Sequence, residues 1–282
     1  MKYSVVIPAY NEEQHILSTL NSLVGQTLLP IQVVVVNDSS TDNTAKLAKE
    51  FSRKYDFIHV INNQAEAKHL PGSKVINAFN TGLNEVQNNW DFIVKLDADL
   101  ILPPDYFQRI AETFQSDETI GMAGGMAYIL KNDQWILESL TDDDHIRGAF
   151  KSYRKACFEQ IGGLPAAMGW DTVDELLAKY HQWQVVVLPE LKVKHLKPTG
   201  AVYNKAARYK QGEAFYRLGY GIWLTLIASI KLATKKRKLM LFADYINGFY
   251  RAKKTKIRPL VTDDQARFIR KYRWKRIKKK LF

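Results

Sequence analysis

Short apolar runs alternate with longer amphipathic stretches over the first hundred residues. The runs are rich in β-branched residues and nearly continuous in apolarity, which is typical of parallel strands covered on both faces. They occupy residues 3–7, 31–36, 57–61 and 91–96. The stretches between them repeat apolar residues at helical spacing, which predicts three helices. These helices cover residues 16–24, 45–55 and 74–86. Because strand and helix alternate with short joins, the sequence predicts an α/β fold with a mostly parallel, doubly wound sheet.

The pattern is less regular after Leu100. Apolar spacing predicts three further helices, over residues 103–114, 153–161 and 172–181. A run broken by glycines predicts a strand over 121–130, and two shorter strands are predicted over 184–188 and 191–196. No internal repeat and no Pro/Ser-rich linker interrupts this part of the chain. The sequence therefore predicts one continuous domain, followed by a helical extension.

The positive charge is concentrated in that extension. Residues 231–282 carry nineteen Lys or Arg and three Asp or Glu, whereas the rest of the chain carries 22 and 26. Apolar and aromatic residues recur among these cations at helical spacing: Leu239, Phe242, Ile246, Phe249, Tyr272, Trp274 and Ile277. Such basic amphipathic helices lie on anionic membranes. Packing on the preceding domain is the alternative. Nucleic acid is not expected as a partner, because no groove-reading motif accompanies the cations.

Compartment and targeting can be read from a few features. The single cysteine, Cys157, cannot form a bridge within the chain, which fits a reducing compartment. The first residues lack the apolar region of a signal peptide. The longest apolar run, residues 222–230, is shorter than the roughly 20 residues that a spanning helix needs. We expect a cytoplasmic protein that is peripheral at the inner face of the membrane.

Polar clusters follow three of the predicted strands, at residues 8–12, 37–42 and 97–99. Ligands of an open parallel sheet bind beyond the carboxyl ends of its strands, so these clusters mark a candidate site. Asp97 and Asp99 are two positions apart and would point to the same side of an extended chain. Converging carboxylates suit Mg²⁺ or Mn²⁺, and a solvated turn is the alternative. Three consecutive aspartates at 142–144 are interpreted as a solvated loop.

The order of these motifs resembles the family 2 glycosyltransferases of the GT-A fold. The matching segments are residues 5–12, 35–42 and 96–99, and the resemblance extends over about residues 3–221. It implies a GT-A nucleotide-sugar-binding domain over 1–221, with a nucleotide-binding half over 1–100 and an acceptor half over 101–221. The basic helical extension then covers 222–282. The resemblance further implies a nucleotide-sugar donor, a divalent cation and inversion at the transferred sugar.

The resemblance also assigns roles at the donor side. Pro8, Ala9, Tyr10 and Glu12 would line the nucleotide pocket. Asp38 would accept a hydrogen bond from the base, which suits the N3–H of uracil, so a UDP-linked donor is expected.

The roles of the residues around the cation follow from the same resemblance. Asp97 would contact the ribose or the donor sugar, and Asp99 would hold the cation, Mn²⁺ or Mg²⁺. His195 follows the last predicted strand and would complete the metal site or touch the diphosphate. A purely structural histidine is the alternative.

One family segment departs from its usual pattern. The family reads Gly-X-X-X-Ala-X-Asn-X-Gly before the metal motif, and here Ala78, Asn80 and Gly82 match while Lys74 replaces the first glycine. Lys74 could pair with a donor phosphate, or it could simply be a basic residue on the first turn of a helix.

The acceptor side carries the candidate general base. In the family a Gly-Gly turn precedes a Glu-Asp pair, whose aspartate takes the proton of the acceptor hydroxyl. Gly162 and Gly163 match the turn, and Asp171 aligns with the aspartate, although Trp170 replaces the glutamate. The nearby carboxylates at 174 and 175 remain alternatives for the base. An acidic helix N-terminus without catalytic function would use any of the three.

The absence of several motifs narrows the class of reaction that the chain can catalyse. The chain has no Gly-X-Gly-X-X-Gly after its first strand, no Walker loop and no Gln-X-X-Arg-Trp signature of processive synthases. We therefore expect non-processive transfer of one sugar to a glycan or lipid-linked acceptor. A nucleotidyltransferase that makes the nucleotide-sugar, and a non-catalytic nucleotide-sugar-binding protein at the membrane, are the alternatives. The sequence names neither the sugar, the acceptor nor the oligomeric state.

Overall fold

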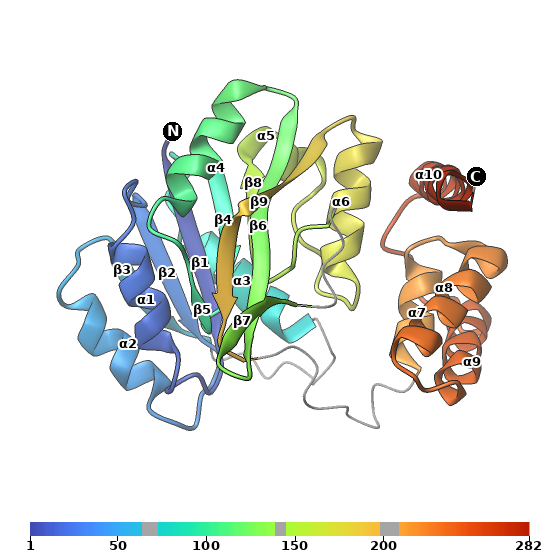
Figure 1. Ribbon diagram of the computed structural model, residues 1–282, viewed down its shortest axis with the longest axis horizontal. Helices are drawn as coiled ribbons and strands as arrows, with labels where there is room; N and C mark the ends of the chain where they lie inside the picture. The colour runs from blue at the N-terminus through green and yellow to red at the C-terminus, as the bar shows by residue number, and fades with distance from the viewer. Residues whose placement is uncertain (64–72, 139–144, 198–208, 282) are drawn as a thin grey trace. The chain divides into compact units, whose positions relative to one another are not determined.

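The computed structural model describes residues 1–63, 73–138, 145–197 and 209–281. Their packing divides the chain into two compact units (Figure 1). The first unit comprises the described residues within 1–67, 75–164 and 181–199, and the second those within 68–74, 165–180 and 200–282. The predicted boundary between residues 221 and 222 stays a prediction.

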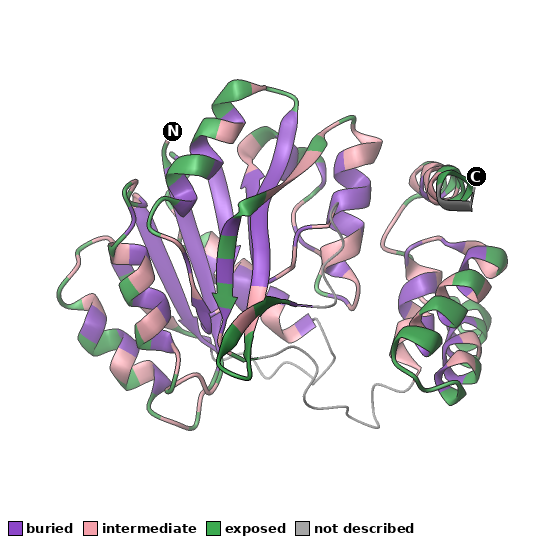
Figure 2. Ribbon diagram, viewed as in Figure 1, coloured by how far each residue is buried: buried purple, intermediate pink, exposed green. Residues whose placement is uncertain are grey.

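Four parallel strands, in the order β3-β2-β1-β4, form one half of the sheet of the first unit. They are β1 (Tyr3–Ala9), β2 (Gln32–Asn37), β3 (Ile58–Asn62) and β4 (Phe92–Leu96). Every residue of β1, β2 and β4 is buried (Figure 2), because helices cover both faces of this part of the sheet. These helices are α1 (Ile16–Val24), α2 (Thr44–Ser52) and α3 (Ser73–Asn84). The strand–helix alternation predicted for the first hundred residues is therefore confirmed.

The other half of the sheet is mixed. Beyond β4 the order continues β8-β6-β9-β5, and β7 pairs with β6. β6 and β9 are parallel to each other, whereas β8, β5 and β7 pair antiparallel with their neighbours. These elements are β5 (Leu100–Ile101), α4 (Tyr106–Ser116), β6 (Ile120–Lys131), β7 (Gln134–Leu137), β8 (Phe150–Arg154), α5 (Lys155–Gln160) and β9 (Gln184–His195).

The start of the helix predicted over 153–161 was wrong. Residues 150–154 form β8 instead, paired with β4 and β6, and the helix α5 begins at Lys155. Tyr153 is fully buried, with its ring 5.5 Å from the Phe158 ring. Pairing on both sides of β8 satisfies its backbone groups, so tertiary contacts override the local helical pattern.

The two strands predicted over 184–188 and 191–196 are one strand, β9, which continues through Pro189. Pro189 cannot donate a ladder hydrogen bond, and the pairing of β9 with β6 has an irregularity at that point. The register passes from Val187 opposite Gly124 to Lys192 opposite Met126. A bulge thus accommodates the proline, and β9 continues to His195.

The second unit is helical over its described residues. It contains α6 (Trp170–Tyr180), α7 (Lys210–Arg217), α8 (Gly221–Lys235), α9 (Met240–Lys254) and α10 (Asp263–Leu281). α7 and α9 approach closely at Gly212 and Gly248: an added Cβ at Gly212 would lie 1.8 Å from the carbonyl oxygen of Tyr245. Within the described part of the chain, none of the helices is long and apolar enough to cross a bilayer.

Candidate active site

The loops that follow β1 and β2 are tied to each other at the carboxyl edge of the sheet. Ala9 lies opposite Asn37 in the strand register, and the backbone N–H of Asp38 donates to the carbonyl of Ala9 at 2.8 Å. Asn11 has a left-handed backbone with φ of 54°, and its Oδ1 accepts from the N–H of Thr41 at 2.8 Å. The two motifs predicted to bind the nucleotide therefore form one connected rim.

Asp38 is held in place by a neighbouring strand end. It is 3% exposed, and Nδ2 of Asn63 donates to its Oδ1 at 2.9 Å. The backbone N–H of Asn63 donates in turn to the carbonyl of Asn37 at 2.9 Å. Asn63 thus fixes the orientation of the carboxylate, which presents its acceptors at the sheet edge.

The four residues predicted around the nucleotide divide into two pairs. Pro8 and Ala9 are buried inside β1, whereas Tyr10 and Glu12 follow the end of that strand. Tyr10 is 45% exposed. Only the second pair has side chains beyond the strand end; the side chains of Pro8 and Ala9 are buried within β1.

Glu12 combines burial with an oxygen that has no partner. Its Oε1 accepts from Nζ of Lys197 at 2.9 Å, while its buried Oε2 has no hydrogen-bond partner among the described residues. Burial raises the pKa of the Glu12 carboxyl, Asp99 adds to the rise, and Lys197 opposes it. Leaving a buried polar atom unpaired is costly, so Oε2 is a natural contact for a bound ligand.

Asp97 follows β4 and forms an ion pair with Lys95, whose side chain is 2% exposed. Lys151 lies directly opposite Lys95 on β8 and is also buried. Burial raises the pKa of the Asp97 carboxyl, Lys95 lowers it and Asp99 raises it further. The backbone N–H of Asp97 donates to the carbonyl of Ala149 at 2.7 Å, which holds the turn against the end of β8.

The pairing of β5 with β9 brings Asp99 and His195 together. Leu100 lies opposite His195 in that register, and the N–H of Leu196 donates to the carbonyl of Asp99 at 2.9 Å. Nε2 of His195 lies 3.4 Å from Oδ2 of Asp99, and both residues are buried. Two side chains that are far apart in the sequence thus face each other from adjacent strand ends.

A third carboxylate, Glu138, contacts the other nitrogen of the imidazole. Oε2 of Glu138 lies 3.3 Å from Nδ1 of His195, and Nη2 of Arg147 lies 2.8 Å from the same oxygen. Burial lowers the pKa of His195, but hydrogen bonds and charge from Asp99 and Glu138 outweigh it and raise the value to about 9. His195 therefore lies buried between two carboxylates, one near each ring nitrogen.

Asp99 and His195 fit a divalent cation as a pair. Across the described ranges, no three His, Cys, Asp or Glu side chains form a complete ligand set. One carboxylate and one imidazole nevertheless match Mn²⁺ or Mg²⁺ sites that are completed by substrate phosphates and water. Glu138 supports this interpretation, because a carboxylate on Nδ1 orients the ring and leaves Nε2 for the ion.

The three candidates for the general base differ in burial. Asp171 lies in the first turn of α6 and is partly exposed, whereas Asp174 and Glu175 are buried. Oδ1 of Asp174 accepts from the N–H of Glu175 at 2.6 Å, and Glu175 lies 3.9 Å from Nζ of Lys179. α6 belongs to the second unit. Asp171 is thus the most accessible carboxylate of the three.

With this geometry established, comparison with known proteins identifies the family. The sequence family described as "Glycosyl transferase family 2" matches residues 4–166, which is more than half of the chain. The chain belongs to glycosyl transferase family 2. Its first relatives in sequence are named as glycosyltransferases, which favours that activity over the nucleotidyltransferase and the non-catalytic alternatives.

Known proteins are similar to this chain in sequence or in fold. An uncharacterized glycosyltransferase of Nostoc sp. is 32% identical over 173 residues, which are 58% of this chain and 50% of that protein. A mannosyltransferase of Pyrobaculum calidifontis in complex with GDP-Man and Mn²⁺ superposes with a TM-score of 0.59 at 15% identity, over 89% of this chain and 75% of that one. TarS of S. aureus (residues 1–349) in complex with UDP-GlcNAc gives 0.58 at 19%, over 89% and 73%. The predicted GT-A fold is confirmed, and the chain spans half or less of the length of the curated relatives it matches first.

The family segment around α3 has a structural explanation. An added Cβ at Gly82 would lie 2.6 Å from side-chain carbons of Val6 and Val36, so glycine lets α3 pack closely on the sheet. Nδ2 of Asn80 lies 3.4 Å from the carbonyl oxygen of Leu164, to which it donates. Lys74, on the first turn of α3, is partly exposed.

The family's Gly-Gly turn ends α5. Gly162 and Gly163 have φ of 78° and 73°, and the N–H of Gly163 donates to the carbonyl of Phe158 at 3.0 Å. Left-handed glycines are the usual way to end a helix in this manner. The match to the family here reflects backbone geometry.

Sequence reasoning missed several residues of this family 2 site. They are Asn63, Lys95, Glu138, Arg147 and Lys197. Lys197 could have been found, because it lies two positions after His195 in a basic stretch. Lys95 lies two positions before Asp97 and could also have been found, whereas Asn63, Glu138 and Arg147 contact residues that no local pattern connects to them. The aspartates at 142–144 lie outside the described residues.

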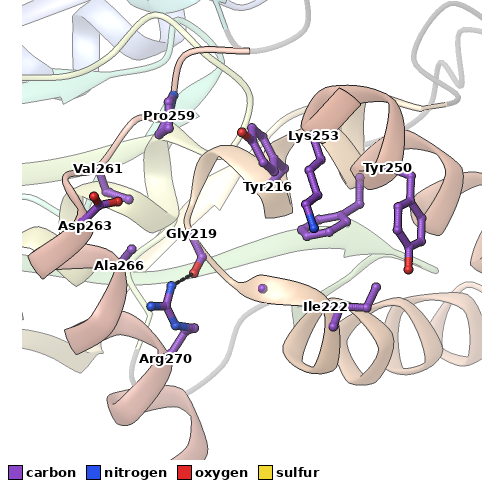
Figure 3. A pocket seen from close by; sticks show the side chains of 12 residues that line it. Tyr216, Gly219, Ile222, Tyr250, Lys253, Pro259, Val261, Asp263, Ala266 and Arg270 are labelled. Carbon is purple, nitrogen blue, oxygen red and sulfur yellow. Dashed lines mark hydrogen bonds between the residues drawn. The ribbon is translucent and has the colours of Figure 1, made fainter. Parts of the chain in front are cut away.

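The second unit contains a cavity of its own, of about 360 Å³ (Figure 3). Its lining combines the aromatic rings of Tyr216 and Tyr250 with the charged side chains of Lys253, Asp263 and Arg270. Nη1 of Arg270 donates to the carbonyl of Gly219 at 2.9 Å. None of the site residues predicted from the sequence lines this cavity.

Proposed function

We propose that this family 2 glycosyltransferase moves one sugar from a UDP-linked donor to a glycan or lipid-linked acceptor, with inversion at the sugar. The observation that carries the proposal is the pairing of Asp99 with His195 at the edge of the sheet where Glu12 presents an unpartnered oxygen. A carboxylate–imidazole pair, next to a carboxylate oxygen that has no hydrogen-bond partner among the described residues, suits a metal-bound nucleoside diphosphate.

Donor recognition rests on the rim formed by the loops after β1 and β2. Asp38, oriented by Asn63, accepts the N3–H of uracil, and Tyr10 and Glu12 contact the nucleoside. The TarS complex contains UDP-GlcNAc and the mannosyltransferase complex contains GDP-Man, so the fold accepts different bases. We infer uridine from the family resemblance at Asp38, whose carboxylate can accept the N3–H of uracil.

The diphosphate end of the donor faces Asp97, Asp99 and His195. Asp99 and His195 would hold a divalent cation, Mn²⁺ or Mg²⁺, which neutralises charge on the departing nucleoside diphosphate when it is bound. Asp97, held by Lys95, contacts the ribose or the donor sugar. Lys74, at the start of α3, pairs with donor phosphate.

Asp171 is the general base of the proposed reaction. The acceptor hydroxyl attacks the anomeric carbon from the side opposite the leaving diphosphate, and Asp171 takes its proton as the new bond forms. This displacement inverts the anomeric centre. The partial exposure of Asp171, in contrast to buried Asp174 and Glu175, supports its choice.

The location of the enzyme in the cell is also part of the proposal. We infer that the basic region after residue 221 holds the enzyme at the cytoplasmic face of a membrane, where a lipid-linked acceptor is accessible. The net charge of this region supports the inference, because anionic lipids attract clustered Lys and Arg.

A thermal-shift screen tests the donor assignment. UDP, GDP, CDP and ADP are added singly, each with and without Mn²⁺, to the full chain. A ligand that binds only the folded state stabilises it by RT ln(1 + [L]/Kd), about 2.7 kcal/mol at a hundredfold excess over Kd. We expect the largest shift with UDP and Mn²⁺ together. An equal or larger shift with another nucleotide contradicts the uridine assignment.

A further inference from the structure

Exposed apolar side chains of the second unit gather on α8 and at the start of α9. Trp223, Ile227 and Ile230 are 71%, 37% and 54% exposed. Their spacing of four and three residues places them on one side of α8. Leu239 and Met240, at the start of α9, are 75% and 79% exposed. We call these five residues the α8 face.

Cations flank the α8 face in a stretch of sequence that contains no acid. The connection from α8 to α9 carries four consecutive exposed cations, here called the basic turn: Lys235, Lys236, Arg237 and Lys238. Lys231 adds a fifth exposed cation on α8. The sequence has no Asp or Glu between residues 221 and 243, and the next acid, Asp244, is buried. Apolar and positive side chains therefore share one continuous stretch of the chain.

The opposite sides of the same helices form the interior of the second unit. Leu224 and Ala233 of α8 and Leu241, Tyr245 and Phe249 of α9 are buried. The sequence suggested that an apolar stripe from Leu239 to Phe249 contacts a membrane. The Phe249 end of this stripe is instead buried in the interior of the second unit.

Of that stripe, Leu239 is exposed and Phe249 is buried, with the Phe249 ring 5.7 Å from the Tyr216 ring. On α10, Phe268 packs against Tyr180 with ring centroids 5.5 Å apart. Internal packing takes up these aromatic residues, whereas the α8 face stays exposed; Tyr250 and Trp274 are single exposed aromatic residues elsewhere in the second unit.

We propose that the α8 face and the basic turn form the surface through which this enzyme docks on an anionic lipid bilayer. Tryptophan and aliphatic side chains enter the interfacial layer, while Lys and Arg meet the lipid phosphates. Each Lys or Arg near an anionic surface strengthens binding by about fivefold. The proposal rests on the membrane location proposed above and names the residues that make the contact.

Charge decides between a bilayer and a second copy of this chain. A symmetric dimer through the α8 face would bring the cations of two copies to one interface, and like charges disfavour such an interface. A surface of anionic lipids supplies the opposite charge over its whole area. The bilayer is therefore the occupant that the charge pattern favours.

Vesicle flotation of the full-length chain tests the proposal. The vesicles contain phosphatidylcholine alone, or phosphatidylcholine with 30% phosphatidylglycerol. One variant replaces the α8 face (W223S/I227S/I230S), and another replaces the basic turn (K235Q/K236Q/R237Q/K238Q). We expect the parent chain to float with the anionic vesicles and each variant to bind them at least tenfold more weakly. Added salt should weaken binding of the parent chain.

Matched controls separate this surface from general charge and apolarity. K271Q/K275Q/K278Q removes exposed cations from α10, and L130S/I136S removes exposed apolar residues from β6 and β7. Both should bind as the parent does, and circular dichroism verifies that every variant is folded. The proposal is overturned if the parent does not float, if the α10 variant loses binding while the variants of the α8 face and the basic turn keep it, or if the α8-face variant instead abolishes a dimer in sedimentation. Because flotation needs neither donor nor acceptor, its result is independent of the proposed sugar transfer.

Discussion

Oε2 of Glu138 lies 3.3 Å from Nδ1 of His195, and this contact sets the direction in which the imidazole faces. The N–H of Glu138 donates to the carbonyl of Ala127 at 2.9 Å, so the hairpin of β6 and β7 carries the carboxylate to its place. Arg147 completes the arrangement from the far side of Glu138. His195 therefore depends on a carboxylate that belongs to no motif of the family considered above.

Replacing Glu138 by Gln should weaken the metal site without removing a ligand. Partners that orient a metal-binding histidine contribute 10- to 100-fold to affinity. We expect the E138Q variant to bind Mn²⁺ in the presence of UDP at least tenfold more weakly, measured by isothermal titration. Arg147 also loses its buried partner, so the free energy of unfolding should fall by about 3 kcal/mol.

The exposed pair of Glu112 and Arg109 provides the control for E138Q. Their side chains are each 48% exposed, and pairs of this kind contribute about 0–1 kcal/mol. E112Q should therefore leave both stability and Mn²⁺ affinity close to those of the parent. Unchanged Mn²⁺ affinity in a folded E138Q variant would mean that Glu138 does not position His195.

Asp99→Asn and His195→Gln should uncouple UDP binding from the divalent cation. Each substitution removes one of the two proposed protein ligands, so the extra stabilisation that Mn²⁺ gives in the presence of UDP should fall at least tenfold in apparent affinity. Binding of UDP without metal should change by less than about threefold. D264N, at an exposed carboxylate that pairs with Arg267, is the control. A full Mn²⁺ response in both site variants would exclude this metal site.

Asp38→Ala should reduce discrimination between UDP and CDP. Uracil donates a hydrogen bond from N3, whereas cytosine has no hydrogen there, so the carboxylate favours uracil. A hydrogen bond to a charged group contributes about 1.5–3 kcal/mol, which corresponds to a 10- to 100-fold loss of UDP affinity in D38A. CDP affinity should change less, as competition binding would show. Equal losses for the two nucleotides would contradict a contact with the base.

Asp171→Asn should abolish transfer and leave donor binding intact. The amide keeps the shape of the side chain and cannot take a proton at neutral pH. We expect the turnover number to fall at least a hundredfold, with UDP affinity within about twofold of the parent. D174N is the comparison: Asp174 is fully buried, so its replacement should lower the melting temperature more than D171N does. Full activity of folded D171N would assign the base elsewhere.

The parallel half of the sheet could be predicted because its signals are local. β1, β2 and β4 are nearly continuous apolar runs, and the motifs at their ends follow directly in the chain. The candidate residues Glu12, Asp38, Asp97 and Asp99 lie at those ends for the same reason. Here sequence pattern and tertiary environment agree, so the pattern is sufficient.

The strand order in the mixed half of the sheet could not be predicted, because it comes from pairing between residues that are far apart in the sequence. Residues 150–154 become β8 only between β4 and β6, and no local pattern distinguishes them from the start of a helix. Glu138 and His195 are 57 positions apart and meet only because β7 and β9 both pair with β6. The periodicity of a single sequence gives no sign of a contact between two residues so far apart.

The chain enters the second unit more than once, and this bears on how the enzyme can be divided. α6 belongs to that unit, β9 with His195 returns to the first, and α7 to α10 follow later. A deletion after residue 221 would strip Tyr180 of its contact with Phe268 while leaving α6 in the protein. Chimeras that exchange the second unit between family members should therefore swap α6 together with α7 to α10 and retain β9. The second unit is a discontinuous module, so exchanging α6 and α7 to α10 requires three junctions rather than one: before residue 165, after residue 180 and before residue 200.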